Sequence, residues 1–381
     1  MPEIASPPAS TLTPAKTARQ RTDTFTSIWM IIAVAMALVT LVVKNRMPQP
    51  LWTMIHLVTL GVLSNGIFQW SWFFARSLAR LSADDPRARH HNTIRILIFN
   101  ACFLLLFVSM WLGWMVGTMI AATGIAAVAA WHGAEMLSVL RERLASRFVI
   151  VVRYYVCSAS FFVLAALLAS FVSATMFSPS IPEALVAMRD RLTLAHALSG
   201  VAGWVGLTIG GTAITLGPTI LRTRMSPDAV RGGVRVLLPW CLSLLLAIAG
   251  ALLGGMPLVG AGILAVGTCA IVGIVYPYAK VLRNKGPREY SAWSFLLGLL
   301  WISMGVCALG VASLFVSTPS QLRVLTFMWL PIIGIAGFAQ LFQGALSYLM
   351  PVVIGGGPSV VRIGIAIIDW QYSLRLGLRN G

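Results

Sequence analysis

The sequence predicts an all-α membrane protein, a polytopic bundle of about ten transmembrane helices. Of its 381 residues, 58% are hydrophobic and only 10% are charged, whereas an ordinary soluble domain has roughly 25% charged residues. Apolar stretches long enough to cross about 30 Å of hydrocarbon recur along the whole chain. Basic residues are divided unevenly between the two sides of these stretches. Composition, span length and charge distribution therefore agree on the fold class.

The chain divides into a tail, a bundle and a terminal segment. Residues 1–26 are rich in Pro, Ser and Thr and are expected to form a disordered cytoplasmic tail. No small-residue cleavage site follows the first apolar stretch, so we expect it to be a retained helix and not a signal peptide. The bundle covers residues 27–358, and residues 359–381 are amphipathic, which favours a helix on the cytoplasmic face over an eleventh crossing. The expected spans are 27–43, 51–75, 95–113, 115–138, 148–172, 195–221, 234–253, 257–280, 290–315 and 324–350.

The basic residues predict the orientation of the bundle. Most of the 28 lysines and arginines lie in the two tails and in alternate loops. By the positive-inside rule, this places both the N-terminus and the C-terminus in the cytoplasm. The net charge of +17 is then a topology signal with some attraction for anionic lipid, not a nucleic-acid footprint. We therefore expect a multi-pass protein of the cytoplasmic (inner) membrane whose first partner is the lipid bilayer. The side predicted to be external keeps only Lys44, Arg46, Arg189, Arg191 and Arg323.

The five cysteines do not suggest a disulfide framework or a zinc site. All five lie within apolar spans, and no CxxC spacing occurs. They are expected to be small core residues.

The stretch from His196 to Arg224 predicts a central packing helix. On a regular helix, a stripe of small residues including Gly203, Gly206 and Gly210 faces one side, where neighbouring backbones can approach closely. A threonine stripe on the opposite side offers hydroxyls to a neighbouring helix or to the carbonyl four residues back.

Two histidines at matched depth are the sharpest signal in the sequence. With a cytoplasmic N-terminus, even-numbered spans begin at the outer surface, and His56 and His196 lie near the starts of the second and sixth spans. Two imidazoles from parallel helices are an ordinary way to hold a b-type haem, and imidazole also suits copper. A proton-transfer or substrate role and separate hydrogen bonding of each ring at the water interface remain open alternatives.

Other polar residues in or near the spans have simpler interpretations. Asn65 lies near mid-membrane and should face a neighbouring helix or a bound water, because hydrocarbon offers an amide no partner. The pair His90 and His91 is expected to lie in a solvated cytoplasmic loop.

His132 and Glu135 share one face of the fourth span. This spacing would allow a metal or a proton relay, but the pair lies near the cytoplasmic edge. We therefore expect an interfacial polar cluster with Arg141 or Arg153.

The histidine count limits the possible activities. A dioxygen-reducing haem-copper centre needs about six histidines at one depth, so the chain is not a complete terminal oxidase on its own. Embedded acids and divided helices, which favour a coupled transporter, are lacking. Whether the protein is an enzyme stays open.

Four sequence stretches resemble a family of actinobacterial polytopic membrane proteins. They are HLVTLGVLSNGIFQWS from His56, GWVGLTIGGT from Gly203, LRTRM from Leu221 and GALSYLMPVVIGGGP from Gly344. In many members, this membrane unit precedes a multicopper-oxidase or copper nitrite-reductase-like domain. The family in turn resembles the haem- and copper-containing NnrS proteins and, more distantly, subunit I of the haem-copper oxidases.

The resemblance implies a bundle arranged like haem-copper oxidase subunit I, with ligands on the second, sixth and tenth helices. His56 falls at the helix 2 haem ligand, and His196 at the first position of an HxHxN pattern. Leu198 and Gly200 replace the second histidine and the asparagine of that pattern, and the tenth helix offers Met328 at the corresponding depth. No cupredoxin domain follows, which suggests a stand-alone or shortened member.

The leading hypothesis is therefore haem b or copper held by His56 and His196, with Met328 as a further candidate ligand. The expected role is electron transfer or the handling of copper or nitrogen oxides. A redox protein or multicopper oxidase and a second copy of the chain are the candidate protein partners. The alternative is a metal-free transporter or a membrane scaffold or assembly subunit.

Overall fold

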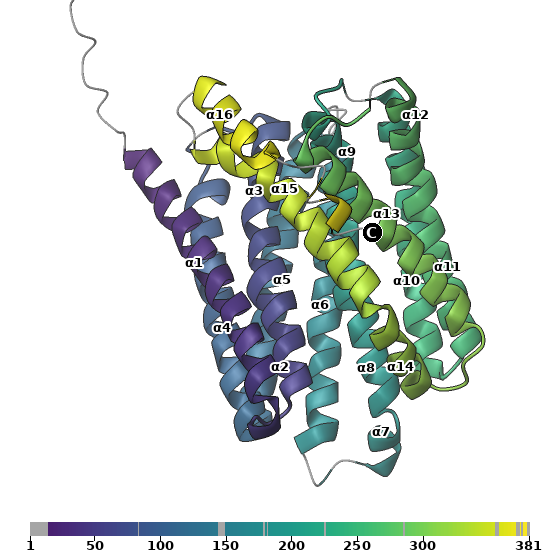
Figure 1. The fold of residues 1–381 in the computed structure, drawn as a ribbon. Coiled ribbons are helices and arrows are strands. Elements are labelled where there is room, and N and C mark those ends of the chain that lie inside the picture. The colour runs from purple at the N-terminus through teal and green to yellow at the C-terminus, as the bar shows by residue number, and fades with distance from the viewer. Residues whose placement is uncertain are drawn as a thin grey trace, which may run out of the picture.

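The computed structural model describes residues 14–370 except 83, 144–148, 178, 179, 181, 225, 285 and 355–357, together with 374 and 376–378; side chains of 14–25, 88, 284 and 352–361 are also outside the description. Within this part of the chain, ten helices are long and apolar enough to cross a membrane (Figure 1). They coincide with the ten expected spans, so the predicted all-α transmembrane bundle is confirmed. Their bounds are Thr26–Arg46, Pro50–Ala79, Arg89–Leu112, Met115–Glu142, Val149–Phe177, Arg189–Ile220, Pro227–Leu253, Met256–Arg283, Tyr290–Ser313 and Pro319–Pro351.

Six of the spans are built on a single long α-helix. Local sequence explains several of their ends: Gly113 and Gly254 adopt positive φ values of 65° and 78° after α4 and α10, as helix C-termini require. Ser226 caps α10 by accepting from the amide of Asp228 at 3.2 Å. These helices are α1 (Pro14–Val43), α4 (Asn92–Leu112), α5 (Met115–Glu142), α6 (Val149–Phe177), α10 (Pro227–Leu253) and α13 (Tyr290–Ser313).

The second, sixth, eighth and tenth spans contain a π-helical segment between two α-helices. The second span runs α2 (Pro50–His56), Leu57–Ser64 in π-helix, then α3 (Asn65–Ala79). The sixth runs α8 (Arg189–Ala197), π-helical Leu198–Gly206, then α9 (Leu207–Ile220). The eighth runs α11 (Met256–Ala270), π-helical Ile271–Val275, then α12 (Tyr276–Asn284). The tenth runs α14 (Pro319–Leu330), π-helical Pro331–Ala339, then α15 (Gln340–Ile354).

Shorter elements lie at the ends of the bundle. They are a 3₁₀ turn (Lys44–Arg46), a π-helical turn (Arg87–His91), α7 (Glu183–Ala187) and α16 (Pro358–Asp369). α16 is about 18 Å long, too short to cross about 30 Å of hydrocarbon. It packs on α15 and α13, and the Asp369 carboxylate accepts from the Tyr290 amide at 2.8 Å.

The first helix starts within the segment that was expected to form the tail. α1 begins at Pro14, so residues 14–26 of that segment are helical. Residues 1–13 lie outside the described residues.

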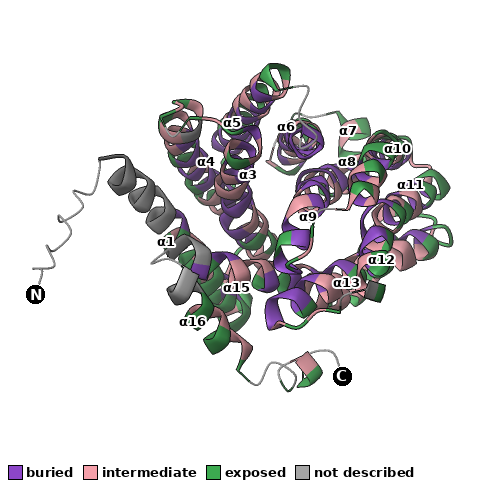
Figure 2. Ribbon diagram, turned by 90° about the horizontal axis from the view of Figure 1, so that it is seen from above, coloured by how far each residue is buried: buried purple, intermediate pink, exposed green. Residues whose placement is uncertain are grey.

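The sixth span lies inside the bundle, as its small-residue stripe predicts. Seen end-on, α9 lies among α6, α10, α13 and α15 (Figure 2), and it contacts all four and α3. The hydroxyl of Thr208 donates to Ser158, and that of Thr212 lies 2.9 Å from the Tyr155 hydroxyl, both on α6. The predicted threonine contacts with a neighbouring helix are therefore present.

Close helix packing is concentrated at particular glycines of the stripe. A Cβ atom built on Gly203 would lie 2.5 Å from the Cβ of Phe161. A Cβ on Gly206 would meet only ordinary contacts, the nearest at 3.5 Å. Uniform helical spacing made these two positions look equivalent, but the π-helical turn between them gives them different neighbours.

The outside of the bundle is apolar, as lipid contact requires. Ile31, Leu112, Leu238 and Val324 are more than half exposed, with fractions of 68%, 73%, 66% and 61%. Such side chains would be costly in water over so large a surface, and they are suited to hydrocarbon.

The contacts around Gly203 and Gly206 predict that the two positions differ in how well they tolerate an added methyl group. Gly203→Ala should destabilise the protein by about 1–3 kcal/mol, because its Cβ would overlap a backbone-proximal atom of Phe161. Gly206→Ala, three residues away, should be neutral or slightly stabilising because alanine is the better helix former. Thermal unfolding of the detergent-purified variants measures the difference, and equal melting temperatures would contradict the packing described here.

Candidate metal-binding site

His56 and His196 come together although 140 residues separate them in the sequence. Their ring centroids lie 6.1 Å apart, and the ring planes differ by only 13°. Each histidine stands next to the π-helical segment of its span, at the end of the bundle where α2, α7 and α14 lie (Figure 1). Both side chains are partly buried. The matched depth inferred from the sequence thus corresponds to a paired arrangement in space.

Each imidazole is oriented by a backbone carbonyl. Nδ1 of His56 lies 2.8 Å from the carbonyl oxygen of Trp52, and Nδ1 of His196 lies 2.8 Å from that of Ala165. A carbonyl oxygen only accepts, so Nδ1 must be the protonated nitrogen in both rings. The lone pair is then on Nε2, the tautomer in which a histidine binds a metal with its second nitrogen held by an outer partner.

Aromatic side chains surround the pair. The Trp52 ring stacks on His56, with centroids 4.3 Å apart and planes 21° apart. Phe107 lies behind Trp52 at 6.2 Å, and the Trp111 indole donates to Thr53 at 3.0 Å. One face of His56 is therefore covered by apolar surface, which restricts its rotation.

The separation of the two stacked rings can be compared with that of two imidazoles that share one metal ion. A metal–imidazole nitrogen bond is about 2.0–2.1 Å long, and a ring centroid lies about 1 Å behind its nitrogen. Two imidazoles on opposite sides of one ion would therefore have centroids roughly 6 Å apart, and the observed value is 6.1 Å.

Met328, the third residue considered from the sequence, lies on α14, which packs against the His196 helix α8. Its side chain on α14 is 70% exposed. Among the described residues, no group of three or more His, Cys, Asp or Glu side chains could hold a metal. The donor set brought together in this part of the chain is therefore the histidine pair.

Beneath the pair, hydrogen bonds between spans continue toward the middle of the bundle. The Trp204 indole donates to the Ser64 hydroxyl at 3.0 Å, which joins the π-helical segments of the second and sixth spans. Asn65 and Asn100 exchange two amide hydrogen bonds of 3.0 and 2.8 Å. The expectation that Asn65 faces a neighbouring helix is confirmed.

His132 does not belong to the interfacial cluster that its spacing with Glu135 suggested. It is wholly buried, and its Nε2 lies 3.2 Å from the Ser71 hydroxyl on α3. Phe68 and Trp204 contact the ring edge to face. The prediction was wrong because two residues three apart on a helix diverge by about 60°, enough here to bury His132 among aromatic rings and to place Glu135 in the ion-pair group at the end of the bundle.

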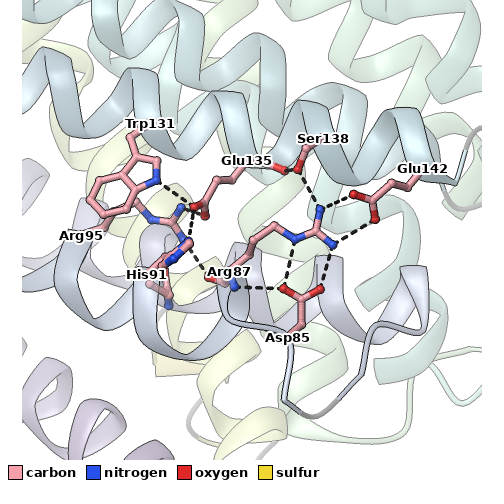
Figure 3. A network of polar contacts seen from close by, with 9 residues as sticks. Asp85, Arg87, His91, Arg95, Trp131, Glu135, Ser138 and Glu142 are labelled. Carbon is pink, nitrogen blue, oxygen red and sulfur yellow. Dashed lines mark hydrogen bonds and ion pairs between the residues drawn. The ribbon is translucent and has the colours of Figure 1, made fainter.

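Glu135 instead pairs with Arg95, an arginine buried within the third span (Figure 3). The Arg95 side chain has no exposed surface, and one of its guanidinium nitrogens contacts a Glu135 oxygen. His91 and the Trp131 indole bind the other Glu135 oxygen at 2.7 and 2.8 Å. The expected partners Arg141 and Arg153 are not those found, and His91 is not merely a solvated loop residue.

A second ion-pair group closes the same end of the bundle (Figure 3). Arg87 pairs with Asp85 at 2.8 Å and with Glu142 at 2.6 Å, and donates to Ser138 at 2.9 Å. The hydrogen bond from Arg87 lowers the pKa of the Asp85 carboxyl. The ionised Asp85 carboxylate therefore stabilises the folded protein fully at pH values above its ordinary pKa of 3.8. This stabilisation is lost as the pH falls through the lowered pKa.

Sequence reasoning did not predict the Arg95–Glu135 pair, because Arg95 is the first residue of the expected third span, 95–113. The only available signal was its position beside a long apolar stretch, where an arginine most often extends to the membrane surface. Its partner lies 40 residues away on another helix, and no local pattern marks such a contact.

The chain matches no protein-family model, no curated protein and no solved structure. Fold and composition define the class: a multi-pass helical membrane protein with ten membrane-spanning helices in its described part. Any more specific function therefore rests on the chemistry of the groups described above.

Because Arg95 and Glu135 form a buried ion pair, we expect removal of the Glu135 charge to destabilise the protein strongly. Glu135→Gln should destabilise the protein by about 3–5 kcal/mol, because Arg95 would be left as an uncompensated buried cation. Glu142→Gln removes a carboxylate that is 49% exposed and should cost less than about 1 kcal/mol. Thermal unfolding at pH 7 compares the two, and similar losses would show that Arg95 does not depend on Glu135.

Proposed function

We propose that the protein is an integral membrane redox protein in which His56 and His196 would hold one haem b. The observation that carries this proposal is the pairing of the two imidazoles, 6.1 Å apart and nearly parallel, with Nδ1 of each ring held by a carbonyl. Separate hydrogen bonding of each ring would require neither the matched orientation nor two free Nε2 atoms. The resemblance of these spans to haem-containing membrane proteins points the same way.

The donor count favours haem over a bare copper ion. A haem brings four nitrogens to its iron, so two imidazoles complete the coordination. Copper would need further protein ligands or a two-coordinate site, and among the described residues no third His, Cys, Asp or Glu joins the pair. Copper therefore remains the second candidate, distinguished by metal analysis.

The residues around the pair would hold it rigid and dry. The carbonyls of Trp52 and Ala165 fix the tautomer and orientation of the two rings. Trp52 covers one face of His56 and keeps water from it. A bound haem would supply reversible one-electron exchange, and these fixed ligands would limit rearrangement between the two oxidation states.

Ligation by two histidines favours electron transfer over small-molecule chemistry. If both imidazoles bind the haem iron, no coordination position is left for dioxygen or a nitrogen oxide. The predicted outer position suits exchange of electrons with a redox protein or multicopper oxidase outside the membrane. Handling of copper or nitrogen oxides would require one histidine to leave the metal.

An optical spectrum tests the proposal. The protein purified from membranes of haem-producing cells should give a Soret band and a reduced-minus-oxidised difference spectrum, with haem b detected as the pyridine haemochrome. His56→Ala and His196→Ala should each abolish these bands. His56→Met should instead keep haem and raise its reduction potential, because a thioether ligand favours ferrous iron.

The matched control is His90→Ala, which removes an exposed histidine at the other end of the bundle and should leave the spectrum unchanged. Copper without haem, lost in the same two histidine variants, would assign the site to copper. Absence of both cofactors from folded protein would refute the proposal and favour the metal-free transporter or scaffold.

A further inference from the structure

A pair of cysteines lies where α6 meets α10. Cys157 on α6 and Cys241 on α10 are 84 residues apart in the sequence, and their thiols interact through a side-chain hydrogen bond. No local sequence pattern marks this contact, because the two residues come from separate spans. Two of the five cysteines, all of which were expected to be small core residues, are therefore in contact with each other.

The packing of the two helices agrees with this contact. The Tyr154 hydroxyl on α6 donates to the carbonyl oxygen of Gly233 on α10 at 2.9 Å. The Tyr154 ring also lies edge to face with Trp240, with centroids 6.3 Å apart. Tyr154 is three residues before Cys157, and Trp240 is next to Cys241. Since the fifth and seventh spans run in the same direction, the two cysteines reach similar depths.

The pair lies toward the lipid-facing side of these helices. Both cysteines are only partly buried. Arg153 and Ser160, one turn before and one turn after Cys157, are exposed. Leu238, one turn before Cys241, is 66% exposed. Because residues three or four apart share one face of a helix, both thiols are accessible from the bilayer.

The depth of the pair restricts the reagents that can reach it. Cys157 is about 12 Å inside the start of α6 at Val149. The side chains that surround the pair are mostly apolar, and both cysteines pack against the same hydrophobic core. A reagent that reaches the thiols from the bilayer must therefore be soluble in hydrocarbon.

A hydrogen bond between two thiols favours oxidation of the pair. The donated hydrogen stabilises negative charge on the accepting sulfur, and the thiolate is the reactive form of cysteine. With an alkyl hydroperoxide as the oxidant, one sulfur attacks the O–O bond, which gives a sulfenic acid and releases an alcohol. The second sulfur then displaces the hydroxyl group as water and forms the S–S bond. The two sulfurs lose two electrons, the peroxide gains them, and the thiol hydrogens leave in the alcohol and the water.

We propose that Cys157 and Cys241 are a redox-sensitive thiol pair, which an alkyl hydroperoxide dissolved in the bilayer converts to a disulfide between α6 and α10. Cys269 on α11 interacts with Cys241 without a hydrogen bond, so Cys157 is the favoured partner. α8 and the π-helical segment Leu198–Gly206 contact both α6 and α10. The disulfide would therefore fasten these two helices around the span that carries His196. The pair shares no residue with the histidine site, so the proposal stands independently of the proposed haem.

A count of free thiols tests the proposal. The purified full-length protein in lipid nanodiscs is first reduced, then treated with cumene hydroperoxide, unfolded and alkylated. All five cysteines should be alkylated before treatment and two fewer afterwards, with Cys157 and Cys241 in one disulfide-linked peptide by mass spectrometry. A dithiol reductant should restore all five. The disulfide should also raise the melting temperature, because it constrains the unfolded chain.

Cys157→Ser and Cys241→Ser should each abolish the linked peptide and the rise in melting temperature. The matched control is Cys269→Ser, which removes the neighbouring thiol on α11 and should still lose two thiols on oxidation. Hydrogen peroxide, which enters hydrocarbon poorly, should act more slowly at the same concentration. Five free thiols after treatment of the wild-type protein, a disulfide between other cysteines, or equal rates for the two peroxides would overturn the proposal.

Discussion

The structure depends on one constraint, that a polar group inside hydrocarbon must find its partner within the protein. Several buried polar groups of the second to sixth spans obey it by bonding across helices. Asn65 meets Asn100, Trp204 meets Ser64, and Arg95 meets Glu135. Each contact is specific in register, because a shift of one residue would leave both partners unsatisfied. These contacts fix the helices against one another more sharply than apolar packing alone.

The later spans are held in a different way. α10, α11 and α13 pack through glycines: a Cβ on Gly262 would lie 2.7 Å from the Cβ of Ala247, and one on Gly310 would lie 2.5 Å from the amide nitrogen of Leu264. Lipid offers no hydrophobic gain for helix association, so such close backbone contact supplies the attraction. This half therefore provides a rigid wall, and the chemically versatile groups gather in the other half.

The sequence was sufficient to predict the spans and the matched depth of the two histidines, because both follow from the pattern of hydropathy and charge along the chain. It was also sufficient for Asn65, whose burial in apolar surroundings demands a partner. It was insufficient for Arg95 and His132, since their environments depend on which face meets which neighbouring helix. The same limit hid a cavity of about 100 Å³ lined by aromatic side chains, whose walls come from four separate spans.

The π-helical segments connect the histidine pair with an apolar cavity lined by α3, α9, α13 and α15. In the second and sixth spans, such a segment begins within two residues of the histidine, and its last turn reaches the cavity through Leu63 and Val205. The tenth span repeats this arrangement with Phe338. A π-helix bonds five residues back and turns less per residue than an α-helix, so residues above and below it face directions that regular spacing does not give. Removing the extra residue from one segment would therefore rotate the histidine relative to the cavity wall on the same helix. A π-helical segment is a rare and irregular form of helix. Here it allows the same helix to place a histidine in the pair and other residues in the wall of the cavity.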